Sequence, residues 1–343
     1  MMARDGDARV FAVHNDDVGR RLDRVLRKLL PRASLDRIYT ALRKREVAVD
    51  GEPREGAYRL AEGQSILLRG PLAAVEPSPA STRTRPDTAQ PGGHAGASTI
   101  GTPSPADHII PVLYRNEHMV VFDKPRGLPV HGQHSVATLM ADHLQRWSQV
   151  SLSFRPGPVH RLDRDTTGIV LFALSLAGAR ELSALLRDRA CQKIYFALLT
   201  GEIGVPEDWQ DTLTRDRGAG RSVADPAGLD AQTQVVPLGV AGGQTLAQVR
   251  IITGRTHQIR AQASLHGHPL VGDTRYGGAP NEGGYVLHCA RFTLPASATV
   301  TDRTRFVSPL PAYSRQILDR HLGADVVSRA LRAHADNGGV IKG

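Results

Sequence analysis

Residues 159–174 read VHRLDRDTTGIVLFAL, a charged decapeptide followed by an uninterrupted apolar run. The run from Ile169 to Leu174 has the length of a buried strand, so the decapeptide stands where that strand begins, a position at which loops often carry function. Asp163 and Asp165 alternate, and an extended backbone would point both carboxylates the same way, as the paired acids of a glycosidase require. A hydrogen-bonded turn of Asp, Arg and Thr residues accounts for the same composition equally well.

Residues 192–199 read QKIYFALL and form a second candidate segment. In a strand, Lys193 and Tyr195 share one face, while the other face is apolar. A tyrosine in a strand is more often part of the core than of a site. By itself this segment therefore favours a structural role.

Residues 253–260 read TGRTHQIR and form a third candidate segment. Gly254 marks the end of a strand, and Thr256 is expected to cap a helix that begins at His257. Arg260 then lies in the first helical turn, where a cation opposes the helix dipole, and we expect it to have an anionic partner. A first-turn arginine is more often a phosphate ligand or a surface residue than a catalytic group.

Strand patterns outnumber helical patterns after residue 108, and several strands follow one another directly. The expected strands are 118–123, 168–174, 191–199, 233–238, 246–252 and 285–294, and the expected helices are 136–147, 176–189 and 256–266. This order predicts an α+β fold with an antiparallel-rich mixed sheet. The sequence contains no GxGxxG, GxxxxGK[ST], CxxC or HExxH pattern, so we expect neither a nucleotide cofactor nor a metal.

The overall composition indicates a polyanionic partner. The 343 residues allow two domains, and 41% hydrophobic residues are enough for a packed core. Lys and Arg outnumber Asp and Glu by 43 to 34, which favours nucleic acid before a membrane. Two cysteines, Cys191 and Cys289, make no disulfide framework, and the chain opens without a basic and apolar leader. We therefore expect a cytoplasmic protein.

The positive charge is concentrated near the N-terminus. Residues 17–45 hold ten Lys or Arg and three Asp. Apolar residues recur at helical spacing over 22–30, and after Pro31 the hydroxyl of Ser34 is placed to cap a second helix. Basic side chains on the other faces of these two helices include Arg20, Arg21, Arg24, Arg37, Arg43, Lys44 and Arg45. A solvated helix surface is the plain structural alternative to a binding face.

Residues 18–69 resemble an RNA-binding S4 domain. The resemblance lies in RLD at 21–23, VAVDG at 47–51 and EGQ at 62–64. Glu46 and Asp50 depart from the glycine and asparagine that this family usually shows. The resemblance implies that the seven basic residues named above contact RNA phosphates.

The remainder of the chain resembles the RluA-type pseudouridine synthases in motif content, order and spacing. The matching motifs are DKPRGLPVH at 123–131, HRLD at 160–163, TTG at 166–168, KIY at 193–195, TGRTHQIR at 253–260, GD at 272–273, YG at 276–277 and LH at 287–288. Thr167 and Cys289 are mild departures from the usual pattern. An S4 module ahead of such a domain is similar to the RluC- and RluD-like branch, which acts on large-subunit ribosomal RNA.

The resemblance implies that Asp163 is the catalytic carboxylate and that Arg260 is its cationic partner. Tyr195 would stack on the uracil and could also help to remove the C5 proton. Arg161 would fill the space left by the flipped nucleotide or bind the flanking phosphate. The remaining candidates, His160, Arg255 and His257, would support the substrate and the loop.

We therefore predict an S4-like domain at 1–70, a flexible linker at 71–108, a catalytic domain at 109–322 and a C-terminal tail at 323–343. The linker prediction rests on its composition, since 27 of its 38 residues are Pro, Gly, Ser, Thr or Ala. The predicted protein is a monomeric isomerase of 23S ribosomal RNA. Two alternatives stay open, a synthase for tRNA or another rRNA position and a non-catalytic RNA-binding or ribosome-assembly factor.

Overall fold

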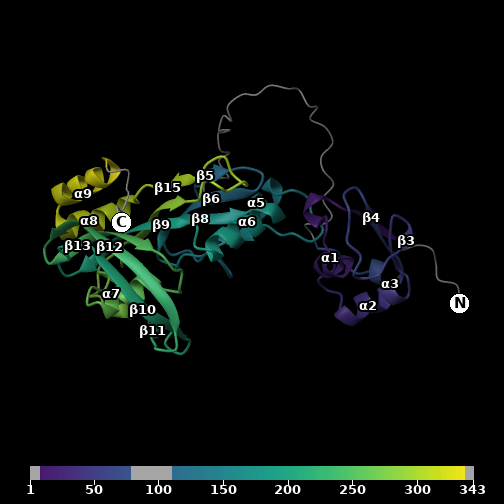
Figure 1. The fold of residues 1–343 in the computed structure, drawn as a ribbon, viewed down its shortest axis with the longest axis horizontal. Coiled ribbons are helices and arrows are strands. Elements are labelled where there is room, and N and C mark those ends of the chain that lie inside the picture. Colours follow the sequence, from purple (N-terminus) through teal and green to yellow (C-terminus); the bar gives the residue numbers. More distant parts are fainter. Residues whose placement is uncertain (1–7, 79–109, 337–343) are drawn as a thin grey trace, which may run out of the picture.

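The computed structural model describes residues 8–78 and 110–336, which form two domains with separate apolar cores (Figure 1). Both domains combine helices with a sheet, and the larger sheet is mostly antiparallel, so the predicted α+β class is confirmed. Within these ranges, no helix is long and apolar enough to cross a membrane.

The N-terminal domain is a small antiparallel sheet covered by two basic helices. Its strands are β1 (Arg9–Ala12), β2 (Val47–Val49), β3 (Glu52–Pro53) and β4 (Ser65–Leu68), in the order β1-β4-β2-β3. The helices are α1 (Leu22–Leu29) and α2 (Leu35–Arg43). As predicted, the Ser34 hydroxyl caps α2 by accepting a hydrogen bond from the Arg37 amide at 3.3 Å.

The N-terminal domain extends beyond the expected boundary at residue 70. A short helix, α3 (Gly70–Ala73), follows β4, and Leu72 and Val75 are buried in the same core. Apolar burial therefore places residues 71–75 in this domain rather than in the linker. The rest of the predicted linker, residues 79–108, lies outside the described residues.

The larger domain is built on an eleven-stranded sheet with the order β11-β10-β12-β13-β9-β14-β8-β6-β5. Its strands are β5 (Val112–Arg115), β6 (Met119–Lys124), β7 (Gly157–Pro158), β8 (Thr167–Ala173), β9 (Gln192–Thr200), β10 (Glu207–Asp216), β11 (Arg221–Ala224), β12 (Leu229–Ala241), β13 (Gln244–Ile251), β14 (Leu287–Thr293) and β15 (Arg305–Val307). Two of them, β15 and β7, lie off this path and pair with β14 and β8.

The helices of this domain lie near the two ends of the sheet (Figure 1). They are α4 (Val136–Leu139), α5 (Ala141–Trp147), α6 (Leu176–Arg187), α7 (Gln258–Leu265), α8 (Ala312–Leu322) and α9 (Ala324–Asp336). The sequence pattern of one helix over 136–147 corresponds to α4 and α5, which meet at Met140.

The segment 323–343, predicted as a tail, contains a packed helix. Val327 and Ala330 of α9 are buried in a core with residues of α8 and of the sheet. Their spacing gives α9 an apolar stripe that covers β12, so the folded domain continues past residue 322.

In the described part of this sheet, β8 and β14 are the one pair of neighbouring strands that run parallel. Gly168 makes the junction possible, because its φ of +100° and its close approach leave no room for a side chain. A Cβ atom there would lie 2.3 Å from the carbonyl oxygen of Cys289. The junction lies directly after the loop that carries Asp163, and Leu287 at the start of β14 lines the same cavity.

Candidate active site

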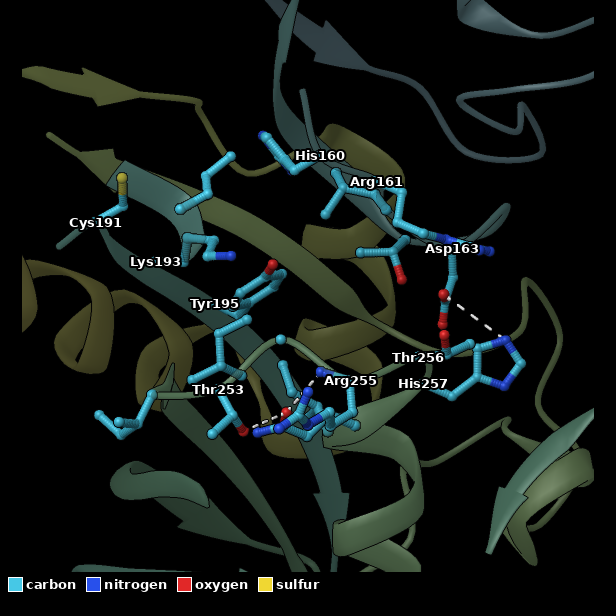
Figure 2. Close-up of a pocket in the computed structure, with 18 of the residues that line it drawn as sticks. His160, Arg161, Asp163, Cys191, Lys193, Tyr195, Thr253, Arg255, Thr256 and His257 are labelled. Carbon is cyan, nitrogen blue, oxygen red and sulfur yellow. Dashed lines mark hydrogen bonds and ion pairs between the residues drawn. The ribbon is translucent and has the colours of Figure 1, made fainter. Parts of the chain in front are cut away.

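The three segments identified from the sequence line one cavity of about 490 Å³ (Figure 2). Its walls come from residues 159–163, from β9 and from residues 251–260. Figure 2 shows Asp163 and His257 facing each other on one side, with Lys193 and Tyr195 opposite. The volume lies in the range of sites for small molecules, and it suits a nucleobase with part of its sugar.

Asp163 stands in the loop before β8, with 15% of its side chain exposed. The backbone turns directly after it, where the Thr166 amide donates to the Asp163 carbonyl at 3.2 Å. Its Oδ2 accepts a hydrogen bond from Arg260 Nη1 at 3.1 Å. The carboxylate therefore reaches the cavity with a cation hydrogen-bonded to it.

Lys124 holds the loop that carries Asp163. Its buried ammonium donates to the carbonyl oxygens of Pro125, Leu128 and Arg164, at 2.9, 2.7 and 2.9 Å. Burial lowers the pKa of Lys124 to about 8, and the charges of Asp165 and Asp163 oppose that effect. This lysine ties the loop after β6 to the residue that follows Asp163.

Arg260 is fixed by a second carboxylate. Its Nε and Nη2 donate to the two oxygens of Asp273, at 2.6 and 2.8 Å, which leaves Nη1 for Asp163. The guanidinium also lies 4.9 Å from the ring centroids of both Tyr276 and Tyr285. Such a planar fork between two aromatic rings has one orientation available to it.

The charge of Arg260 is stable in this setting. Burial alone would lower its pKa, but the hydrogen bonds that it donates to Asp273 and the charges of Tyr285, Asp273 and Asp163 raise it above the ordinary value. The predicted anionic partner of Arg260 is confirmed, and there are two of them.

Tyr195 lies on β9 in the centre of the sheet and faces the cavity. Burial, together with the neighbouring Cys289, raises the pKa of the phenol well above its usual value. The hydroxyl therefore keeps its proton at neutral pH.

His257 adopts a left-handed conformation with φ of 53°, directly before α7. The helix begins at Gln258, so the predicted start at His257 and the cap by Thr256 are wrong. The Gln258 side chain organises the turn instead, because its Oε1 accepts hydrogen bonds from the Thr253 hydroxyl at 2.7 Å and the Arg255 amide at 2.9 Å.

The unusual backbone of His257 brings its ring to the catalytic loop. Nε2 lies 3.7 Å from Asp163 Oδ1, and Nδ1 lies 2.9 Å from the Tyr276 hydroxyl. Burial lowers the pKa of His257 to about 4, although the charge of Asp163 opposes this. The imidazole is therefore neutral near pH 7 and positions its neighbours without adding charge.

The three remaining site residues predicted from the sequence, His160, Arg161 and Arg255, have different environments. The ring of His160 stacks on Phe292 at 5.2 Å, and its Nε2 accepts the Leu171 amide at 3.1 Å, which is a structural contact. Arg161 is exposed at the rim of the cavity. Arg255 also lines the cavity, and its Nε donates to the Asp230 carbonyl at 2.8 Å.

The basic residues of the N-terminal domain form more than one group. Arg20 and Arg24 of the predicted set line a hollow of about 410 Å³ together with Arg27 and Lys28. We define these four side chains as the basic hollow. Their spacing along one helix face was visible in the sequence, but Arg27 and Lys28 were not among the predicted contacts.

The rest of the predicted basic set lies outside this hollow. Arg21 pairs with Asp23 at 2.7 Å. The Arg37 guanidinium donates to the Pro71 carbonyl, and Arg43 donates to the Thr40 hydroxyl at 3.1 Å. The last two, Lys44 and Arg45, follow α2 and do not line the hollow.

Sequence reasoning assigned no role to three residues that hold Arg260. Asp273 and Tyr276 belong to the GD and YG motifs, so their signal was present without an assigned partner. Tyr285 lies outside every motif and only the fold brings it to Arg260.

Comparisons with known proteins agree with this geometry. A family model described as RNA pseudouridylate synthase matches residues 118–265. Ribosomal large subunit pseudouridine synthase C of Vibrio vulnificus is 30% identical over 280 residues, which cover 78% of this chain and 80% of that protein. Ribosomal large subunit pseudouridine synthase D of Xanthomonas campestris pv. campestris is 31% identical over 319 residues, covering 92% and 83%.

A solved structure shares the fold. Human RNA Pseudouridylate Synthase Domain Containing 4 superposes with a TM-score of 0.50 and 24% identity, over 61% of this chain and 92% of that one. Fold and relatives together define an isomerase that acts on RNA. The chain belongs to the RNA pseudouridylate synthase family, and the resemblance identified from its motifs is confirmed.

Proposed function

We propose that this enzyme converts uridines of 23S ribosomal RNA to pseudouridine in the cytoplasm, with Asp163 as the catalytic carboxylate. The observation that carries the proposal is the contact between Asp163 and Arg260 on the wall of a cavity that Tyr195 also lines. The substrate class follows from relatives whose names refer to the large ribosomal subunit.

The reaction needs a negative group beside C1′ of the target nucleotide. The N1–C1′ bond breaks, the uracil turns, and C5 bonds to C1′, while C5 loses a proton and N1 gains one. An ionised Asp163 either attacks the sugar or stabilises the positive charge that develops on it. Arg260 holds the carboxylate in place, and the neutral His257 limits its movement from the other side.

A stacked uridine cannot reach this cavity, so the nucleotide has to flip out of its helix or loop at a cost of a few kcal/mol. Tyr195 offers its ring as a stacking surface for the extruded base. Arg161, exposed at the rim, suits the vacated space or the flanking phosphate because a guanidinium both stacks and binds phosphate. The basic hollow adds sequence-independent phosphate binding, and we propose that a monomer carries out the whole reaction.

The catalytic role can be tested with transcribed ribosomal RNA whose uridines carry tritium at C5. We expect the wild-type protein to release tritium and Asp163→Asn to release none. Asp165→Asn is the matched control, because this acid lies in the same loop but is 41% exposed and pairs only loosely with Arg126, at 3.8 Å. Release by Asp163→Asn would remove the carboxylate from the mechanism.

The substrate can be tested by the same assay on separate transcripts. We expect release from 23S ribosomal RNA and none from 16S ribosomal RNA or tRNA. Release from tRNA alone would replace the proposed substrate, and no release from any transcript would favour a ribosome-assembly factor that has lost the chemistry.

A further inference from the structure

A buried carboxylate of the N-terminal domain is held entirely by the catalytic domain. Asp17 ends a 3₁₀ turn, Asn15–Asp17, and its side chain is 0% exposed. Its oxygens accept hydrogen bonds from the Ser151 hydroxyl at 2.9 Å, the Leu152 amide at 2.9 Å and the Ser153 amide at 3.1 Å. The Ser153 hydroxyl donates a fourth bond.

This arrangement makes the two domains depend on each other. A buried charge is costly unless hydrogen bonds or a counter-charge compensate it. Among the described residues, the hydrogen-bond donors to the Asp17 carboxylate all belong to residues 151–153. When the domains separate, both the carboxylate and its donors lose these hydrogen bonds and have to bind water instead.

Apolar packing supports the same contact. Leu152 belongs to the chain of the catalytic domain, but its side chain is 1% exposed and lies in the apolar core of the N-terminal domain. The residue before Asp17 makes a further contact: Asp16 Oδ1 accepts a hydrogen bond from the Leu176 amide at 2.9 Å. Leu176 is the first residue of α6, where the helix dipole favours a carboxylate. Figure 1 shows the N-terminal domain at this end of the larger sheet, beyond α5 and α6.

Arg20 connects this contact to the basic hollow. Its Nη1 donates to the Ser153 hydroxyl at 2.8 Å, and its side chain also lines the hollow with Arg24, Arg27 and Lys28. The phosphate-binding surface therefore begins at the domain contact itself, and its position relative to the catalytic domain is set by that contact.

We propose that Asp17 is a docking residue that fixes the basic hollow relative to the active site, so that one RNA contacts both at once. The inference rests on the proposed function and narrows its substrate to RNA with structured regions beyond the target loop. Binding at the hollow then raises the effective concentration of the target uridine at the cavity. A short stem–loop that fills only the cavity gains nothing from the docked domain.

Docking itself can be tested without RNA, by small-angle X-ray scattering of the full chain. We expect wild-type scattering that is unchanged between low and high salt, and a larger radius of gyration for Asp17→Ala. Asp36→Ala, an exposed acid of α2, is the matched control and is expected to scatter like the wild type. A wild-type protein as expanded as Asp17→Ala would overturn the inference.

The functional consequence can be tested by tritium release from a long 23S transcript and from a short stem–loop with the same uridine. We expect the wild type to have a higher kcat/KM on the long RNA than on the short one. In Asp17→Ala, kcat/KM on the long RNA should fall about tenfold, because the loss of a linked site lowers the effective concentration of the target. Its kcat/KM on the short RNA should not change. Ser153→Ala removes a donor to Asp17 and should also lower the preference for the long RNA. Agreement between the two variants would show that the effect does not come from misfolding of one of them.

Failure of this inference differs from failure of the proposed function. If wild type releases tritium and both docking variants keep the full preference for long RNA, docking plays no part in substrate choice. If wild type releases no tritium from either RNA, the proposed function fails, and the scattering result stands on its own.

Discussion

Arg260 donates hydrogen bonds to two carboxylates, two to Asp273 and one to Asp163. Asp273 takes two of its nitrogens in a buried pair, with only 2% of the acid exposed, and Asp163 takes the third. The ring centroids of Tyr276 and Tyr285 each lie 4.9 Å from the guanidinium. The orientation of the cation toward Asp163 is therefore set before any substrate arrives, which is the condition for electrostatic stabilisation without reorganisation.

Asp273→Asn should lower kcat with little change in KM. The amide cannot balance the charge of Arg260, which then moves toward Asp163, and a displacement of about 1 Å in a site can cost on the order of 100-fold in rate. Tritium-release kinetics on ribosomal RNA provide the measurement. Asp319→Asn is the matched control, because it also removes an Arg–Asp pair, to Arg315 at 2.7 Å, but on a half-buried helix surface. An unchanged kcat for Asp273→Asn would show that Asp163 does not depend on this arrangement.

At this scale the sequence predicted the main charges but not how they are held. The position of Arg260 in a first helical turn indicated an anionic partner, since the dipole argument needs only local structure. Asp273 could not be assigned, because tertiary packing alone brings it to Arg260. The left-handed backbone of His257 was also missed, because a positive φ at a residue other than glycine is uncommon and has no clear sequence signal.

Strand β8 and its parallel neighbour β14 form the element on which the site depends most. Gly168→Ala should destabilise the fold by more than about 1–3 kcal/mol, because the strained φ is joined by a clash with the Cys289 backbone. Urea unfolding followed by circular dichroism measures the change. Gly127→Ala has a similar positive φ of 79° but open space around it, and it should cost less. Equal effects at the two glycines would mean that the close approach contributes nothing.

Strands with long runs of apolar residues were predicted, and strands with a polar sequence were not. Helix α9 was also missed, although its buried residues recur at helical spacing. The runs that became β6, β8, β9 and β14 are rich in buried apolar residues. Strand β10 reads EDWQDTLTRD, and among its residues only Trp209 and Leu213 are buried, so its pattern is too weak to identify alone. Its place is determined by pairing with β12.

Across the described part of the molecule, four histidines that are at least half-buried contribute to the response to acid. Burial lowers the pKa of His160 to about 3 and of His257, His288 and His334 to about 4. In the unfolded chain these groups titrate near the ordinary value of about 6.5. Between these pH values the unfolded state binds more protons, so stability rises with pH across the window and is lost as the pH falls.

His334→Phe should weaken this acid sensitivity. The replacement keeps the aromatic contact with Phe196, whose ring centroid lies 4.9 Å away, and it removes one titrating group. The slope of the unfolding free energy against pH between 4 and 6.5 should fall by up to the equivalent of one proton. Urea titrations at several pH values provide the slope. A slope equal to that of the wild type would mean that His334 titrates normally in the folded protein.

The parallel junction between β8 and β14 also has a consequence for synthesis of the chain. Asp163 precedes that junction, while Arg260 and Tyr195 come from the part of the polypeptide translated after α6. A nascent chain that ends at α6 already holds its basic N-terminal helices and the carboxylate, but neither the guanidinium nor the ring. With the roles proposed above, the growing polypeptide would attach to RNA before it could alter a nucleotide, because its active site is complete only after Arg260 has been translated.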